Sequence, residues 1–352
     1  GSGATSFGGT VSTSGQIGAG NANGIDLTGN NVRFKDTVTT TNGGAIRLVN
    51  AGTLTIDKNA NFSVNGKFDQ VGDGATVLGG DITTVNADIS FNQGVTLSQG
   101  VSLSTGGGSN SGGNITFSNT LDATTAGADT LTLTAGAGSV TFSDVVGGAS
   151  GANRLGAVTI NQAEDVTIGN AFSAASFNQV AATIGTGIFK LDGDLNTDTG
   201  AITISSDTVD LNANVKTTAG GTNGKVTINA GAGGVDLADT KVITTTAAAD
   251  SGRVSGGIDI DAAGAVSVEG IIDTTGAANT SGGTASAGGA VTIDTTGAAT
   301  ISLSAITTTG GASTVTGGVG GAAGTITLNT NTGLVTLDSS TITAAGGAGD
   351  AQ

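Results

Sequence analysis

The chain has 352 residues, 64 of them glycine, and contains no proline, cysteine, histidine, methionine, tryptophan or tyrosine. Without cysteine and histidine it cannot form disulfides, zinc sites with thiolate or imidazole ligands, or the Ser-His-Asp and Cys-His centres of nucleophilic catalysis. The formal net charge of −16 argues against binding to nucleic acid or to an anionic membrane surface, because both require clustered lysine and arginine.

The high glycine content indicates neither collagen nor disorder. The sequence has no Gly-X-Y period and no proline, and its hydrophobic residues, 37% of the chain, alternate with polar ones. No apolar run approaches the roughly 18 residues of a membrane-spanning helix, so we expect no membrane insertion. No signal peptide is visible, and we expect any export signal to lie on a part of the polypeptide outside this sequence.

Short apolar–polar–apolar triplets begin near the N-terminus and continue along the chain. In a strand, the outer two residues of a triplet point inward, and the middle residue, usually Thr, Ser or Asp, points outward. We therefore expect many short strands with an apolar inner face and a hydroxyl-rich outer face. The triplets include Ile25–Leu27, Val32–Phe34, Ile46–Leu48, Leu54–Ile56, Phe62–Val64, Ile89–Phe91, Val95–Leu97, Val101–Leu103, Ile115–Phe117, Leu131–Leu133, Val140–Phe142, Val158–Ile160, Val166–Ile168, Ile202–Ile204 and Val209–Leu211.

In the last third of the chain the triplets form a repeat. Val226, Ile258, Val291 and Ile326 begin successive copies, at intervals of 32, 33 and 35 residues. A repeating unit that cannot bury its own apolar face must stack on copies of itself, which predicts a solenoid. The connections between triplets are too short for crossover helices, and crossovers between parallel strands are right-handed. The sequence therefore predicts an all-β fold, a right-handed parallel β-helix with three short strands per coil and about 13–15 coils.

The repeats of the last third are longer than a bare coil. The interval from Ile202 to Val226 is 24 residues, so each longer repeat carries an inserted loop. We expect the Gly/Ala/Ser/Thr-rich loops 246–257, 276–289 and 309–324 to fall at one phase of the repeat and to line one edge of the solenoid.

A change of composition near residue 190 suggests two parts. All ten phenylalanines lie at or before Phe189. We expect a β-helix part with a Phe-containing core over 1–190 and a part with regular Gly/Ala/Thr-rich repeats over 191–352, joined as one continuous solenoid. Neither end carries the polar cap that solenoids need. We expect the chain to be a segment of a longer protein, or its copies to cap one another end to end.

One acidic stretch is a candidate metal site. Asp192, Asp194, Asn196 and Asp198 supply oxygen ligands of the kind that Ca²⁺ prefers. The stretch lacks the final Glu of an EF-hand loop, and an acidic β-turn explains the same residues. We expect no other cofactor.

Catalysis has little support in the residues. Asn196-Thr197-Asp198 matches the Asn-Thr-Asp of polygalacturonases, but the Gly-His-Gly and Arg-Ile-Lys motifs of that family are absent. Glu164 and Glu269 are isolated, and no paired carboxylates stand out. Thr53–Thr55 and Thr130–Thr134 resemble the Thr arrays of ice-binding solenoids, although Thr is also common at exposed strand positions. We expect a protein that is not an enzyme, with a polysaccharide-active β-helix enzyme as a remote alternative.

The repeats resemble those of filamentous-haemagglutinin-like and autotransporter-passenger β-helix proteins of bacterial surfaces. The resemblance rests on Gly289–Ile293, on Gly324–Asn329 and on Gly333–Leu337. It implies a secreted or surface-anchored protein that acts as a structural rod, stalk or matrix filament. The alternative function it implies is an adhesin that binds glycans or a host surface through the loop edge.

Overall fold

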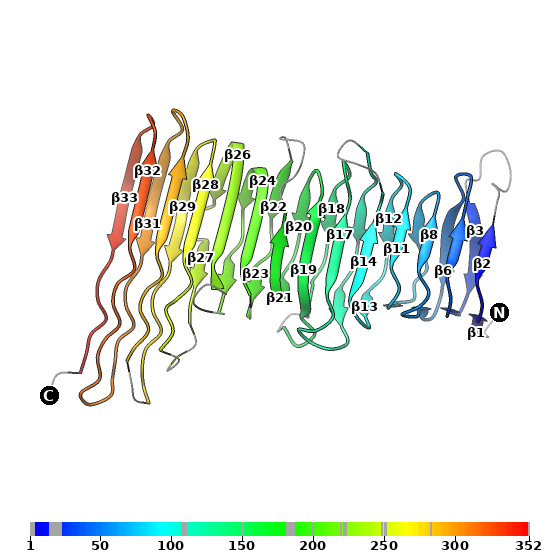
Figure 1. The fold of residues 1–352 in the computed structure, drawn as a ribbon, viewed down its shortest axis with the longest axis horizontal. Coiled ribbons are helices and arrows are strands. Elements are labelled where there is room, and N and C mark those ends of the chain that lie inside the picture. The colour runs from blue at the N-terminus through cyan, green and yellow to red at the C-terminus, as the bar shows by residue number, and fades with distance from the viewer. Residues whose placement is uncertain are drawn as a thin grey trace. The chain divides into compact units, whose positions relative to one another are not determined.

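The computed structural model describes residues 4–13, 23–106, 111–148, 151–180, 187–198, 200–218, 220, 224–247, 249, 252–281 and 284–350. Over these ranges the protein is all-β, and its strands pair in parallel (Figure 1). Within the same ranges, no helix has the length and apolarity that crossing a bilayer requires. The chain divides into two compact units, unit 1 up to Ala175 and unit 2 from Ser176, which are described separately.

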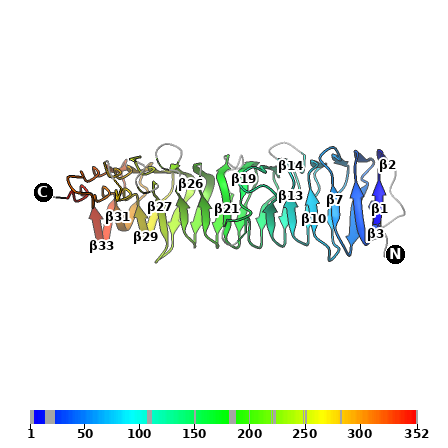
Figure 2. The ribbon, with the colours of Figure 1, turned by 90° about the horizontal axis from the view of Figure 1, so that it is seen from below.

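In unit 1, strands β1 to β15 each pair with the strand three places further along the chain, and β17 and β18 pair with β19 and β20, two places further, so that three stacks of strands form. The first stack contains β1 (Ala4–Phe7), β4 (Asn31–Phe34), β7 (Leu54–Ile56), β10 (Thr76–Leu78), β13 (Val95–Leu97) and β16 (Leu121–Ala123). The second contains β2 (Val11–Thr13), β5 (Val38–Thr40), β8 (Phe62–Val64), β11 (Ile82–Thr84), β14 (Val101–Ser104), β17 (Leu131–Thr134) and β19 (Leu155–Gln162). The third contains β3 (Asn23–Gly29), β6 (Ala45–Asn50), β9 (Phe68–Gln70), β12 (Ile89–Phe91), β15 (Ile115–Phe117), β18 (Val140–Phe142) and β20 (Val166–Ile168). Figure 2 shows β7, β10 and β13 of the first stack side by side.

The alternation predicted for the triplets is confirmed by the burial of their side chains. Leu54 and Ile56 of β7 are fully buried, whereas Thr55 between them is half-buried. Aligned strands place like residues above one another, as in the column formed by Phe91, Phe117 and Phe142. Neighbouring rings in this column have centroids 5.5 Å apart and interplanar angles of 7° and 2°. The interior of unit 1 is therefore filled by stacked apolar side chains.

The fully buried side-chain amides of Asn50 and Gln70 in unit 1 hydrogen-bond to each other and to nearby backbone carbonyls. The Gln70 Nε2 donates to Asn50 Oδ1 at 2.7 Å and to the carbonyls of Gly72 and Gly74 at 3.0 and 3.1 Å. The Asn50 Nδ2 donates to the carbonyls of Gly52 and Gly74 at 2.7 and 2.8 Å. Because buried polar groups are costly when unpaired, this network fixes the backbone that follows β6 and β9.

Unit 2 follows the same rule with longer strands. Several strands bend and continue from one stack to the next. Thus β26 pairs with β28 through its first half and with β29 through its second half. The strands are the last four residues of β21 (Phe172–Gln179), then β22 (Ile188–Leu191), β23 (Leu195–Thr197), β24 (Ile202–Leu211), β25 (Val215–Thr217), β26 (Val226–Leu237), β27 (Val242–Thr245), β28 (Ile258–Ala262), β29 (Val266–Asp273), β30 (Val291–Thr295), β31 (Ile301–Thr307), β32 (Ile326–Thr330) and β33 (Val335–Thr343).

In the last third of the chain, the residues that begin successive sequence repeats pair with one another in the structure. Val226 pairs with Ile258, Ile258 with Val291, and Val291 with Ile326. The interval of 32 to 35 residues therefore corresponds to one complete return of the chain to the same stack. Of the ten phenylalanines, Phe177 and Phe189 belong to unit 2, where their ring centroids are 5.9 Å apart.

The segments predicted as loops at one phase of the repeat lie against one another. Figure 1 shows 276–289 and 309–324 as extended traces beyond β29 and β31. The Gly276 amide donates to the carbonyl of Thr309, and the Gly310 amide donates to that of Ala345, at 2.8 and 2.9 Å. The approach is close: a Cβ on Gly321 would lie 2.0 Å from the Ser286 carbonyl oxygen. Glycine is required here because no side chain fits between the backbones.

Candidate functional site

Of the four residues predicted to bind calcium, all around β23 in unit 2, Asp192 and Asp194 are exposed, whereas Asn196 and Asp198 are half-buried. The Asp192 carboxylate accepts from the Lys190 ammonium at 2.7 Å and from the Asn212 amide at 3.1 Å. The hydrogen bond from Lys190 is the main reason why the pKa of Asp192 lies below its ordinary value.

Asp194 also makes hydrogen bonds to the neighbouring coil, and Asn196 and Asp198 lie in or next to strand β23. The Asp194 Oδ1 accepts from both the main-chain and side-chain nitrogens of Asn214, each at 3.0 Å. Asn196 lies within β23, opposite Lys216 of β25, and Asp198 follows the strand. Within the described ranges, no group of three or more Asp, Glu, His or Cys side chains is placed to hold a metal ion. The side chains of Asp192 and Asp194 tie one coil to the next, and calcium binding by this stretch stays a prediction.

A second acidic group lies on the outer face of unit 2. Asp261 of β28 pairs with Asp294 of β30, and Asp294 pairs with Asn329 of β32. The Asn329 Nδ2 donates to Asp294 Oδ1 at 2.6 Å, and Lys225 forms an ion pair with Asp259 at 2.8 Å. Partial burial raises the pKa of Asp261 above its ordinary value of 3.8, and the carboxylates of Asp259 and Asp294 raise it further.

This elevated pKa predicts how the stability of unit 2 depends on pH. Between the unfolded and folded pKa values of Asp261, the folded protein binds more protons, so stability falls as the pH rises through that window. The ionised side chain then costs stability at neutral pH. We expect Asp261→Asn to raise the midpoint of thermal unfolding at pH 7 by about 1–2 °C. At pH 3 the carboxyl of Asp261 is protonated, and the substitution should change the midpoint little. Differential scanning calorimetry at both pH values measures this, and an equal shift at both would contradict it.

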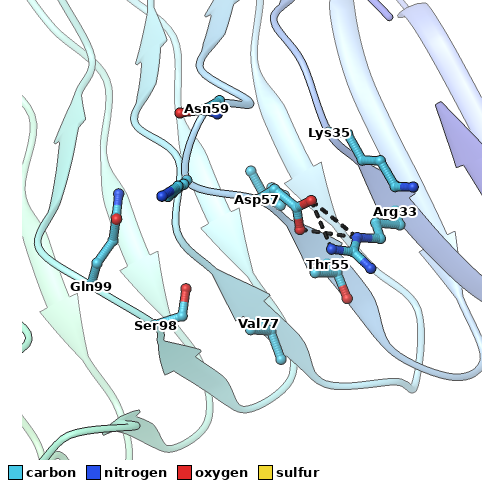
Figure 3. A pocket seen from close by; sticks show the side chains of 10 residues that line it. Arg33, Lys35, Thr55, Asp57, Asn59, Val77, Ser98 and Gln99 are labelled. Carbon is cyan, nitrogen blue, oxygen red and sulfur yellow. Dashed lines mark hydrogen bonds and ion pairs between the residues drawn. The ribbon is translucent and has the colours of Figure 1, made fainter. Parts of the chain in front are cut away.

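A polar hollow of unit 1 lies on the first stack of strands (Figure 3). It has a volume of about 420 Å³. Figure 3 shows Arg33 and Lys35 on one side, Ser98 and Gln99 on the other, and Asp57 between them. Its lining residues are Arg33, Lys35, Thr55, Ile56, Asp57, Lys58, Asn59, Val77, Ser98 and Gln99.

Two glycines let the corners of neighbouring coils approach closely beside the hollow. Strand register places Leu78 between Ile56 and Leu97, so the corner after β10 lies between the corners after β7 and β13. The residues at that corner are Gly79 and Gly80, and both are buried. A Cβ on Gly79 would lie 2.6 Å from Ser98 Oγ, and the Gln99 Nε2 donates to the Gly79 carbonyl at 2.6 Å.

The charges around the hollow are unequal. Arg33 donates to Asp57 through Nε at 3.1 Å to each oxygen and through its terminal nitrogen at 2.9 Å, so this pair is neutral overall. The exposed ammonium groups of Lys35 and Lys58 make no ion pair or side-chain hydrogen bond with the described part of the chain. The arrangement offers two free positive charges beside a fixed guanidinium–carboxylate pair. It can hold an anion, and Asp57 is the single carboxylate among its lining residues.

The sequence did not predict this hollow. A signal was present, because five of the eleven Lys and Arg residues fall between Arg33 and Lys67. The overall charge of −16 concealed it. The role of Gly79 and Gly80 also needed the strand register, since glycine is frequent throughout the chain.

Comparisons of this chain with protein-family models, with curated proteins and with solved structures found no match.

Proposed function

We propose that each unit is a right-handed parallel β-helix with three strands per coil. The pairing of strands β1 to β15 of unit 1 with the strand three places later supports this arrangement, and so does the pairing of successive repeats in unit 2. Right-handedness is inferred from the strong preference of parallel strand connections for that hand.

We propose that the chain is a segment of a non-enzymatic structural rod or filament, located outside a bacterial cell or on its surface. The observation that carries this proposal is the in-register stacking of like residues from coil to coil, as in the column of Phe91, Phe117 and Phe142. Such stacking makes the fold stiff, because each coil is bonded to the next over three faces. The resemblance to bacterial surface β-helix proteins supports the location, and absence of cysteine is compatible with it.

The proposal can be tested by shortening the protein in register. Deletion of residues 76–120 removes six strands, β10 to β15, and joins Ala75 to Leu121. Strand β16 would then stack on β7, and β17 on β8. We expect a folded protein whose length is reduced by about 10 Å, the height of two coils. Small-angle X-ray scattering and electron microscopy measure the change.

A deletion of five strands is the matched control. Removal of residues 76–114 joins Ala75 to Ile115 and brings β15 onto the wrong stack. We expect this variant to unfold or aggregate. Equal folding of the two variants, or a compact globular shape of the intact chain, would contradict the proposal.

For the structural role itself, the intact chain and its six-strand deletion can be displayed on a cell surface. The distance of a terminal label from the surface should shorten with the deletion, and an unchanged distance would contradict a stalk.

A further inference from the structure

The hollow beside Arg33 continues into a second one on the same face of unit 1. This neighbouring hollow has a volume of about 450 Å³ and shares Arg33, Lys35 and Thr55 with the first. The rest of its lining is mostly polar, with Thr5, Ser6, Asn31 and Thr53 beside Ala4 and Val32. Together the two hollows form a groove across the coils of β1, β4, β7, β10 and β13, which we call the cationic groove.

The charge of the cationic groove opposes the charge of the protein. The chain carries −16 overall, whereas the groove holds the unpaired ammonium groups of Lys35 and Lys58 beside the neutral Arg33–Asp57 pair. Lysine ammonium groups left exposed and unpaired attract carboxylate or sulfate groups, and the attraction is screened by salt. A ligand for this groove is therefore anionic.

The uncharged lining suits a ligand rich in hydroxyl groups. Asn59 and Ser98 are exposed, and Thr55 and Gln99 are half-buried, so their amides and hydroxyls face the groove. Val77 is its half-buried apolar side chain, and no aromatic ring lines either hollow. A neutral sugar would find no ring on which to stack, and an apolar peptide side chain would find no pocket. A ligand must therefore be held by hydrogen bonds to its hydroxyl groups together with attraction to the two lysine ammonium groups.

The groove is open along its length. Arg33, Lys35 and Lys58 are all exposed, and equivalent outward positions recur at each coil, about 4.8 Å apart. An extended polymer can follow such a surface, whereas a small molecule would leave most of its own surface in water. We propose that the cationic groove binds an acidic polysaccharide, with Lys35 and Lys58 contacting its carboxylate or sulfate groups. Asn59, Ser98 and Gln99 hydrogen-bond to its hydroxyls. This binding activity is additional to the structural role and does not depend on it.

The proposal can be tested by titration calorimetry on the full chain. The probes are an oligogalacturonate for carboxylates, a sulfated glycosaminoglycan hexasaccharide for sulfates, and maltohexaose as the neutral saccharide. We expect at least one acidic probe to bind, with affinity that falls between roughly 50 and 300 mM NaCl. Maltohexaose should not bind. The double variant Lys35→Gln/Lys58→Gln should weaken binding about tenfold or more.

Two further variants distinguish a built groove from general attraction. Lys216→Gln/Lys241→Gln removes two other lysines, both in unit 2, and should change the affinity less than about twofold. Val77→Glu keeps both lysines but places a carboxylate in the groove, and it should weaken binding as the lysine variant does. Whether the carboxylated or the sulfated probe binds identifies the anionic group. The proposal is overturned if neither acidic probe binds, if maltohexaose binds equally well, or if the unit 2 variant loses as much affinity as the groove variant.

Discussion

Replacement of Gln70 by leucine is expected to lower the free energy of unfolding of unit 1 by at least about 3 kcal/mol. The substitution removes the donor to Asn50 Oδ1 and to the Gly72 carbonyl, and the acceptor of the Gln93 amide at 3.2 Å. Gln70 and Asn50 are both fully buried, so water cannot replace the lost partners. Each buried group left unpaired costs about 1–3 kcal/mol. Urea unfolding followed by circular dichroism measures the loss.

Gln179 provides a matched comparison within the same chain. It is 1% exposed, as deeply buried as Gln70, but neither of its side-chain polar atoms has a hydrogen-bond partner among the described residues. Gln179→Leu therefore removes an unsatisfied buried amide. We expect a change between neutral and a gain of about 1 kcal/mol in the stability of unit 2. Equal destabilisation by both substitutions would show that side-chain volume, and not hydrogen bonding, determines the outcome.

The second large effect is expected at Phe117. Its ring is 1% exposed and lies between the rings of Phe91 and Phe142, with centroids 5.5 Å from each. Phe117→Ala would leave a cavity within the column and remove both ring contacts, at a cost of about 3–5 kcal/mol. Because each coil of a solenoid is stabilised by its neighbours, the loss should destabilise the coils on both sides. Chemical denaturation and hydrogen exchange of β12, β15 and β18 measure the total and its distribution.

Phe117→Leu is the control for this prediction. Leucine keeps much of the volume but not the ring contacts, and we expect a loss of about 1–2 kcal/mol. A loss below about 1 kcal/mol for the alanine variant would mean that the column collapses without cost. Hydrogen exchange confined to β15 would contradict the coupling between neighbouring coils.

The sequence predicted the local conformation of this protein well because side-chain alternation is a local property. A triplet such as Leu54-Thr55-Ile56 has one conformation that buries both apolar residues, and this conformation is the strand found as β7. The intervals between Val226, Ile258, Val291 and Ile326 likewise predicted which residues would pair. The sequence could not show that segments 276–289 and 309–324 bond to each other through Gly276 and Gly311, because glycine is equally common in open loops.

The sequence by itself thus determined the all-β character, the inward and outward faces and the repeat, since each follows from the order of residues within one coil. Only the tertiary structure decided which outward side chains meet. Arg33 forms its ion pair with Asp57, which lies one coil later in the chain. The number of residues between such partners changes with the length of each corner. Lys58 and Ser98 border one groove because strand register places the corner after β10, with Gly79 and Gly80, between the corners after β7 and β13. Contacts between coils depend on the register of whole strands, and register is fixed by burial of the complete apolar face, not by the residues that make the site.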